Sequence, residues 1–217
     1  MISLFSHKKA KLHSGFTLIE MLVVIALFSI LSGIVLLNYR GFGSDLLLTN
    51  LSYDIALSLR KAQSYGVSVK SLSSGTSNFT YSYGVHFNVG SFGGTQTSYS
   101  LFIDNSTTGS NANVYDGGDT ILETYTITNQ NKILELCYRL NSNDPSDTCT
   151  NQGSNNPAVI DILFKRPNPD AVITRCPNDN NLSNCIPDNA TAKIRLQSVR
   201  GIIRDVTVRD TGEISVK

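Results

Sequence analysis

One apolar run near the N-terminus limits what this chain can fold into. Residues 16–37 form 22 consecutive positions with a single charged side chain, Glu20. As an α-helix this run would be about 33 Å long, enough to cross a hydrocarbon core of about 30 Å. A carboxylate in such a helix costs about 2 to 3 kcal/mol near the bilayer centre, so it is expected to have a partner. The run therefore predicts a membrane-spanning helix with a functional acid at its start.

A short basic segment precedes the run. Residues 1–15 contain Lys8, Lys9 and Lys11 and no acidic residue. Because lysine-rich flanks stay on the cytoplasmic side, the N-terminus is predicted to be cytoplasmic and the remainder extracytoplasmic. A secretory signal has its small-residue cleavage site after the apolar run, whereas here Gly15 stands before it. Cleavage at Gly15 would leave the apolar helix on the mature protein.

The hexapeptide GFTLIE at residues 15–20 resembles the class III leader of type IV prepilins and type II secretion pseudopilins. The resemblance implies that a prepilin peptidase cuts after Gly15 and methylates the new amino group of Phe16. It also implies an assembly role for Glu20, with Thr17 beside it, because the family's acid pairs with the N-terminal amine of a neighbouring subunit. The alternative is an ordinary membrane anchor whose Glu20 reaches the interface.

The same resemblance implies partners and a location. The partners are the prepilin peptidase, other pilins or pseudopilins that contact the N-terminal helix, and an inner-membrane assembly platform. The location is the cytoplasmic membrane, as a single-pass protein that enters a surface pilus or pseudopilus. Type II secretion systems, type IV pili and competence pseudopili share this N-terminal chemistry, so the machine stays open.

Beyond the run, the helical pattern changes. Gly41 and Gly43 interrupt it, and Ser44 or Asp45 is a candidate cap for a new start, so a hinge or kink is predicted here. The next residues predict an amphipathic helix to about residue 65, since apolar side chains recur at spacings of three and four. These side chains are Leu48, Leu51, Ile55, Leu59 and Ala62.

Strand patterns dominate the remainder. Residues 79–89 alternate strictly, which predicts a strand with six apolar side chains on one face and His86 on the polar face. Further strands are predicted at residues 98–103, 120–128, 133–138, 159–164, 192–199, 204–209 and 213–216. Polar segments at residues 71–77, 105–118 and 141–157 are predicted to be exposed loops.

The expected fold class is α+β, a pilin-like lollipop in which a long N-terminal helix packs on a mainly antiparallel sheet. Its first half spans the membrane. The expected organisation is a cleaved leader at residues 1–15, a membrane and assembly helix at 16–40, a hinge and amphipathic half at 41–66, and an extracytoplasmic β-rich domain at 67–217.

Four cysteines, Cys137, Cys149, Cys176 and Cys185, lie in the predicted exported part, where disulfides form and persist. Three connectivities exist for four cysteines. The sequence spacing favours Cys137 with Cys149 and Cys176 with Cys185, each closing one loop. A metal site is the lesser alternative, because the segment lacks a C-x-x-C pair.

The C-terminal half resembles, more thinly, the minor pseudopilin H and FimT group, through residues 58–66, 162–171 and 206–214. The resemblance implies DNA uptake as an alternative function, since FimT-type members bind DNA through a basic C-terminal region. Phosphate contacts need clustered cations. The candidate contacts are Lys193, Arg195, Arg200, Arg204 and Arg209. The plainer reading is that these are solvated charges at strand edges, with Arg200 and Arg204 at a hairpin tip.

Nothing in the sequence indicates an enzyme, a cofactor or a metal site. His86 has no nucleophile elbow, phosphate loop or paired carboxylates near it in sequence. Asp116 and Asp119 flank two glycines, but two carboxylates are too few to specify a calcium loop. The remaining alternative, a membrane-tethered enzyme or carbohydrate-binding module, would need a pocket at residues 105–118 or 141–157.

Overall fold

The computed structural model describes residues 15–68, 81–90, 95–106, 112–140, 146–150, 157–177, 184–188 and 190–217. The leader up to residue 14, the loop predicted at residues 71–77 and the first two positions of the strand predicted at 79–89 lie outside these residues. The chain forms two compact units, Met1–Phe42 and Gly43–Lys217.

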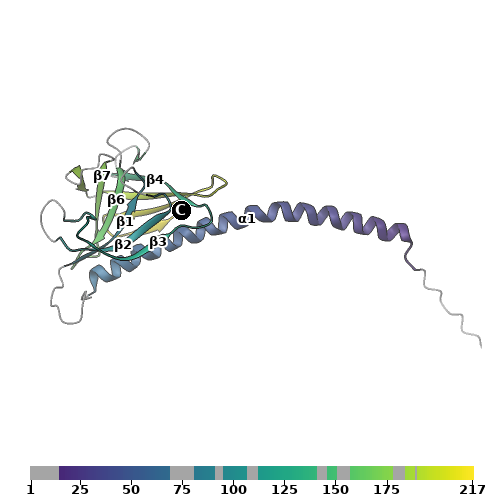
Figure 1. Ribbon diagram of the computed structural model, residues 1–217, viewed down its shortest axis with the longest axis horizontal. Coiled ribbons are helices and arrows are strands. Elements are labelled where there is room, and N and C mark those ends of the chain that lie inside the picture. The colour runs from purple at the N-terminus through teal and green to yellow at the C-terminus, as the bar shows by residue number, and fades with distance from the viewer. Residues whose placement is uncertain are drawn as a thin grey trace, which may run out of the picture. The chain divides into compact units, whose positions relative to one another are not determined.

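One helix, α1 (Leu18–Val67), belongs to both units (Figure 1). No new helix starts at residues 44–45, because α1 continues through Gly41 and Gly43. The hinge or kink expected at residues 38–45 stays a prediction. Neither Ser44 nor Asp45 caps a new start. Ser44 Oγ and Asp45 Oδ1 are buried with no hydrogen-bond partner in the described part of the chain, and the Asp45 carbonyl accepts from Thr49 Oγ1 at 2.8 Å, as in a helix interior. A helical glycine costs about 1 kcal/mol, too little to stop a long helix.

Strands make up most of the second unit. In chain order they are β1 (Ser82–Asn88), β2 (Ser98–Asp104), β3 (Thr120–Thr126), β4 (Lys132–Arg139), β5 (Thr148–Cys149), β6 (Pro157–Phe164), β7 (Ala171–Pro177), β8 (Ile186–Asp188), β9 (Thr191–Gln197), β10 (Ile203–Arg209) and β11 (Ile214–Val216).

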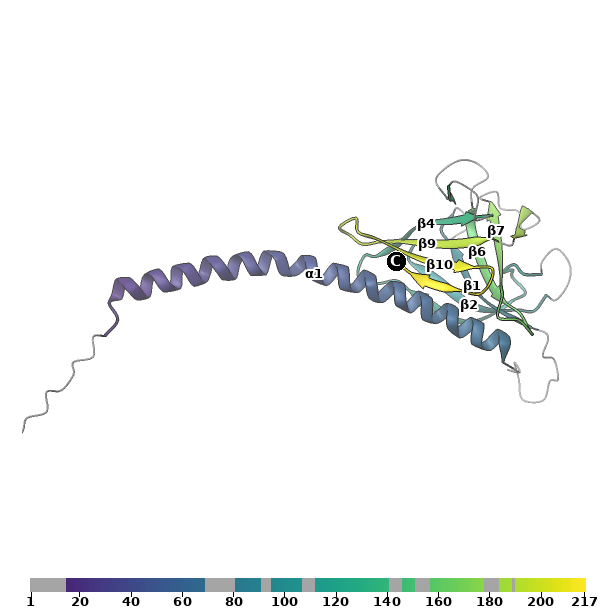
Figure 2. The same cartoon turned by 180° about the vertical axis from the view of Figure 1, so that it is seen from behind.

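These strands form two antiparallel sheets, seen from opposite sides in Figures 1 and 2. The first sheet has the order β3-β2-β1-β6-β7-β8, and the second has the order β11-β10-β9-β4-β5. Every ladder between neighbouring strands is antiparallel. The α+β class, with an N-terminal helix and mainly antiparallel sheets, is therefore confirmed.

The main core lies where the two sheets and the second half of α1 meet. From the helix, the predicted stripe supplies buried Leu48, Ile55, Leu59 and Ala62, with Leu51 partly buried. The first sheet contributes residues such as Phe87 and Phe164 to the same cluster. The second sheet adds a similar row of aliphatic side chains: Ile133, Leu136, Ala192, Ile194, Leu196, Val206 and Val208.

The sequence predicted most strands but missed three. β7 lay unrecognised after a proline-rich turn, although Val172, Ile173 and Thr174 are β-branched residues of the kind that favour strands. The short strands β5 and β8 have only two and three residues and carry no readable period.

Two of the predicted exposed loops are partly wrong. The segment at residues 141–157 contains β5 and the first residue of β6. The segment at residues 105–118 includes buried Val114, which packs in a small second cluster with Val159 and Cys176. The physical reason is the same in both segments. A polar segment is ordered when neighbouring strands accept its few apolar side chains.

Candidate processing and assembly site

The site expected from the sequence is the segment that leads into α1. Gly15 has nothing within 4 Å of the position a Cβ would occupy, and Phe16 is 77% exposed. Both residues precede the first helical residue, Leu18. The peptide bond between Gly15 and Phe16 therefore lies outside the helix.

Thr17 caps the helix. Its Oγ1 accepts a hydrogen bond from the Glu20 backbone N–H at 3.3 Å, and its carbonyl accepts from the Met21 N–H at 3.2 Å. An N-cap hydroxyl satisfies one of the four N–H groups that lack helical partners. Sequence reasoning grouped Thr17 with Glu20 but missed this role, which the spacing T-x-x-E of a capping box signals.

Glu20 lies in the first turn of α1. There the unpaired N–H groups give the helix end a partial positive charge, which favours a carboxylate. Glu20 follows Phe16 by four residues, and its pairing with the amine of a second subunit stays a prediction.

The helix from Leu18 to Leu36 has no buried residue in its most apolar window and is long and apolar enough to cross a membrane. The large apolar side chains of this stretch are 50–79% exposed. They make no core of their own, so the stretch needs lipid or other helices around it.

The structure contains two disulfides, Cys137–Cys149 and Cys176–Cys185, which are the pairings that the spacing favoured. The first joins β4 to β5, and the second ties β7 to the segment before β8. Closing a loop of this size stabilises a fold by about 3 kcal/mol in the chain-entropy model. Glu135 lies near Cys137 and Cys149, but disulfide sulfurs are not the thiolates that bind metals.

His86 is not the surface residue that the sequence suggested. Its Nδ1 lies 2.6 Å from Oδ1 of Asp161, a fully buried carboxylate on the next strand. The other carboxylate oxygen accepts the Tyr115 N–H at 2.9 Å, and the Tyr115 ring lies 4.4 Å from the imidazole. The segment that contains Tyr115 therefore covers the outer face of β1, and His86 helps to hold this segment in place.

The same network does not form a nucleophilic site among the described residues. Ser100 is the cross-strand neighbour of His86, but its Oγ lies 3.4 Å from Thr124 Oγ1 instead. An activated serine needs a hydrogen bond to its base.

The two aspartates of the candidate calcium loop, Asp116 and Asp119, bind the protein's own backbone, and Asp116 accepts the Gly118 N–H at 2.7 Å. Asp119 accepts the N–H groups of Asn105 at 2.9 Å and Asp116 at 3.0 Å. Asp104 accepts those of Ser106 at 2.8 Å and Asn113 at 2.9 Å. Burial raises the pKa of Asp104 and of Asp119, and these hydrogen bonds partly offset that effect.

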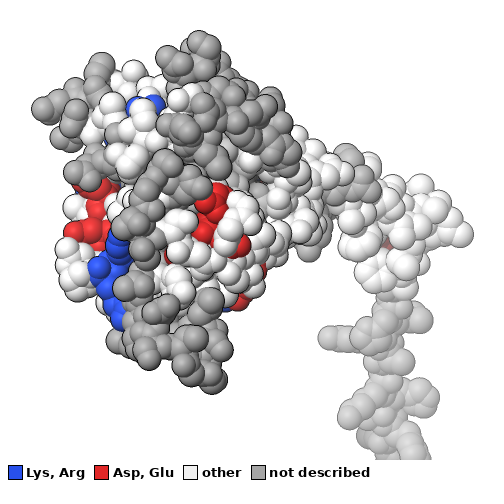
Figure 3. Space-filling view, turned by 60° about the vertical axis from the view of Figure 1, so that its left-hand side comes forward, with Lys and Arg blue, Asp and Glu red and all other residues white. Residues whose placement is uncertain are grey.

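Most of the candidate DNA contacts are engaged with carboxylates. Lys193 pairs with Asp147, which also binds Arg139 at 2.6 Å. The remaining ion pairs join Arg195 to Glu135 and to Asp205, and Arg209 to Glu213. Figure 3 shows one face of the molecule, on which both basic and acidic side chains are exposed. The hairpin predicted at Arg200 and Arg204 is present between β9 and β10.

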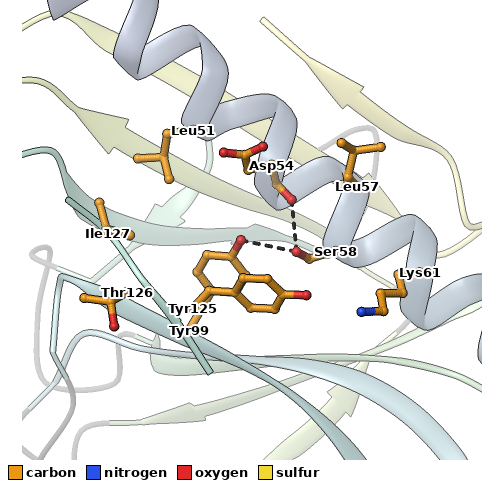
Figure 4. A pocket seen from close by; sticks show the side chains of 9 residues that line it. All are labelled: Leu51, Asp54, Leu57, Ser58, Lys61, Tyr99, Tyr125, Thr126 and Ile127. Carbon is orange, nitrogen blue, oxygen red and sulfur yellow. Dashed lines mark hydrogen bonds between the residues drawn. The ribbon is translucent and has the colours of Figure 1, made fainter. Parts of the chain in front are cut away.

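A cavity of about 370 Å³ lies between α1 and the edge strand β3, within the second unit (Figure 4). Tyr99 and Tyr125 stack at its base, with ring centroids 4.9 Å apart. Ser58 Oγ lies 3.2 Å from the Tyr99 hydroxyl. Burial raises the pKa of Tyr99 to about 12, so this phenol stays neutral and serves as a packed, hydrogen-bonded wall.

Comparison with known proteins gives one match. A family model for the prokaryotic N-terminal methylation motif matches residues 11–36. No curated protein and no solved structure matches the chain. The matched residues include the hexapeptide at 15–20 and the exposed apolar helix.

Proposed function

We propose that this chain is a minor pilin or pseudopilin, a structural subunit that is processed after Gly15 and assembled through α1. The methylation motif supports a type IV pilin-like protein with a prepilin leader. The apolar helix after that leader fits a single-pass membrane anchor followed by a C-terminal unit. The motif match carries the proposal, and the lysines at positions 8, 9 and 11 support a cytoplasmic N-terminus.

Processing is the first test. The Gly15→Val variant is expected to keep its leader, because the residue before the cut then carries a branched side chain. The matched control is Gly33→Ala, which changes a glycine with open space around it inside the same apolar helix. Mass spectrometry of the protein from cells with an active prepilin peptidase should find N-methylated Phe16 in the wild type and control. A wild-type chain that still begins with Met1 would contradict the proposal.

Assembly is the second test. Glu20→Gln keeps the shape of the side chain but removes the charge that would meet an N-terminal amine. We expect membrane insertion and cleavage to persist and recovery in the sheared filament fraction to fall at least tenfold. Ser29→Ala is the control, since the Ser29 hydroxyl donates to the Ile25 carbonyl of its own helix at 2.7 Å. Normal incorporation of Glu20→Gln would remove the assembly role of this acid.

The alternative, a DNA-binding subunit for transformation, has less support. DNA binding needs free clustered cations, and Lys193, Arg195 and Arg209 pair with carboxylates on or beside the second sheet. Membership of the pseudopilin H and FimT group remains a proposal that rests on the thin resemblance of the C-terminal half.

A further inference from the structure

The hairpin tip between β9 and β10 presents apolar side chains to solvent. We define this tip as residues 198–204. Val199 is 61% exposed and Ile203 is 44% exposed. Backbone hydrogen bonds from Ser198 N to the Ile202 carbonyl and from Gly201 N to the Ser198 carbonyl, both 2.9 Å, hold the turn. The exposure thus belongs to an ordered turn.

Basic side chains accompany these apolar ones. The tip carries Arg200, which is exposed, and Arg204, and residues 198–204 contain no carboxylate. The neighbouring loop between β3 and β4, residues 127–131, is also free of acids, and Lys132 follows it. Apolar tips flanked by arginines are the composition that binds the headgroup region of anionic bilayers.

The internal contacts of the second unit place the tip at one end of that unit. Gln63, near the end of α1, donates to the Gly212 carbonyl at 3.1 Å, so the β10–β11 turn lies at that end of the helix. β10 runs from this turn back to Ile203, over a length of about 20 Å. The tip therefore lies toward the end where α1 enters the unit, as both views show (Figures 1 and 2).

That end is tethered close to the apolar segment. Six residues, 37–42, separate Leu36, the end of the apolar stretch, from Gly43, the first residue of the unit. Even a fully extended chain of this length spans only about 25 Å. If α1 crosses a bilayer, the end of the unit that carries the tip stays within reach of the bilayer surface.

We propose that the β9–β10 tip docks on the anionic lipid surface of the membrane that α1 crosses. Val199 and Ile203 enter the boundary between headgroups and acyl chains, and Arg200 and Arg204 bind lipid phosphates. The contact would hold the folded unit against the membrane before assembly. This inference rests on the membrane-anchored function proposed above and goes beyond it by naming a second lipid contact.

The test uses the absence of tryptophan from the chain. In the full-length protein, Val199→Trp introduces a single reporter that itself prefers the membrane interface. The matched control is Leu140→Trp, because Leu140 is also an exposed apolar residue but follows β4 at the opposite end of the same sheet. Both proteins are reconstituted into vesicles of phosphatidylglycerol and phosphatidylethanolamine, with and without bromine on the acyl chains.

The expected result is a blue-shifted Val199→Trp emission that brominated lipid quenches at least twofold more than that of Leu140→Trp. Adding Arg200→Gln and Arg204→Gln should reduce this quenching, and so should phosphatidylcholine vesicles. Equal quenching of the two reporters in vesicles that float with the protein would overturn the proposal. Protein that does not float would show instead that α1 fails to anchor, which contradicts the proposed function. Equal quenching in lipid together with an emission change on adding duplex DNA in detergent would also overturn it, in favour of nucleic acid.

Discussion

Three aspartates in or beside the first sheet accept hydrogen bonds from the protein's own backbone. Asp104 and Asp119 each bind two N–H groups, and Asp161 binds one N–H and His86. Together they fix residues 112–119 onto the outer face of the first sheet. A charged acceptor of this kind contributes about 1.5 to 3 kcal/mol per hydrogen bond.

Two glycines with positive φ differ in what surrounds them, and this gives a prediction about stability. Gly212 (φ 78°) lies against the Pro169 carbonyl, and a Cβ there would come within 2.7 Å of Gln63 Nε2, whereas Gly201 (φ 80°) has open space. Gly212→Ala should lower the unfolding free energy by about 2 to 4 kcal/mol, from backbone strain plus overpacking. Gly201→Ala should cost only about 1 to 2 kcal/mol, from strain alone. Urea unfolding followed by circular dichroism measures both, and equal losses would contradict the contact at Gly212.

The site residues show what sequence can and cannot predict. GFTLIE at residues 15–20 carries its chemistry in consecutive positions, so a reader of the sequence can find it. The environment of His86 could not be read, because Asp161 and Tyr115 come from strands and loops far along the chain. Alternation within β1 predicts two faces but does not reveal that a distant segment covers the second one.

The helix and strands were likewise predictable where neighbouring residues carry the pattern, and not where distant residues decide. The buried stripe of α1 was predictable because a helix repeats every 3.6 residues, and β1, β9 and β10 were predictable from their period of two. β6 was predictable from a short, mostly apolar run, which is buried throughout. β5 and β8 depend on the disulfides and on neighbouring strands, which local pattern cannot show. The new helix start expected after Gly41 and Gly43 is absent, because local propensity has less weight than the continuity of a long helix.

An ion cluster on the second sheet predicts acid sensitivity. Burial alone would raise the pKa of Asp147, but hydrogen bonds from Lys193 and Arg139 outweigh burial and lower this pKa. A carboxyl with a lowered folded pKa stabilises the fold above its unfolded value of about 4, and this contribution disappears as the pH falls through the folded pKa. Asp147→Asn should therefore cost up to about 1 kcal/mol at neutral pH, since solvent screens the pair, and the cost should shrink toward pH of about 2.

Urea unfolding at a series of pH values would measure this difference. Asp170→Asn is the control, because Asp170 is exposed and forms no ion pair within the described ranges. A cost for Asp147→Asn that does not change with pH would show that the ion cluster is not the cause.

The two units differ in how many apolar side chains they bury. All the residues of the main core, from Leu48 to Val208, lie in Gly43–Lys217. The unit Met1–Phe42 contributes none of them, and its large apolar side chains from Phe16 to Leu36 are exposed. The buried core that stabilises the fold thus belongs to the second unit, whereas the first unit contributes an exposed apolar helix.

This division predicts that residues 43–217 fold alone. A fragment that begins at Gly43 and is exported to an oxidising compartment should form both disulfides and unfold cooperatively. Its urea midpoint should match that of the full-length protein in mild detergent, because no core side chain is removed. A fragment with the same boundaries but Leu59→Ala, which opens a cavity in the core, should lose about 2 to 5 kcal/mol. A fragment without a cooperative transition would show that the first unit supports the fold.

The bare helix from Leu18 to Leu36 has one further consequence. Since its most apolar window has no buried residue in the described part of the chain, replacing lipid with the flanks of other helices would be a change of solvent and not a change of conformation. In the function proposed above, the subunit would then move between bilayer and fibre without unfolding its second unit.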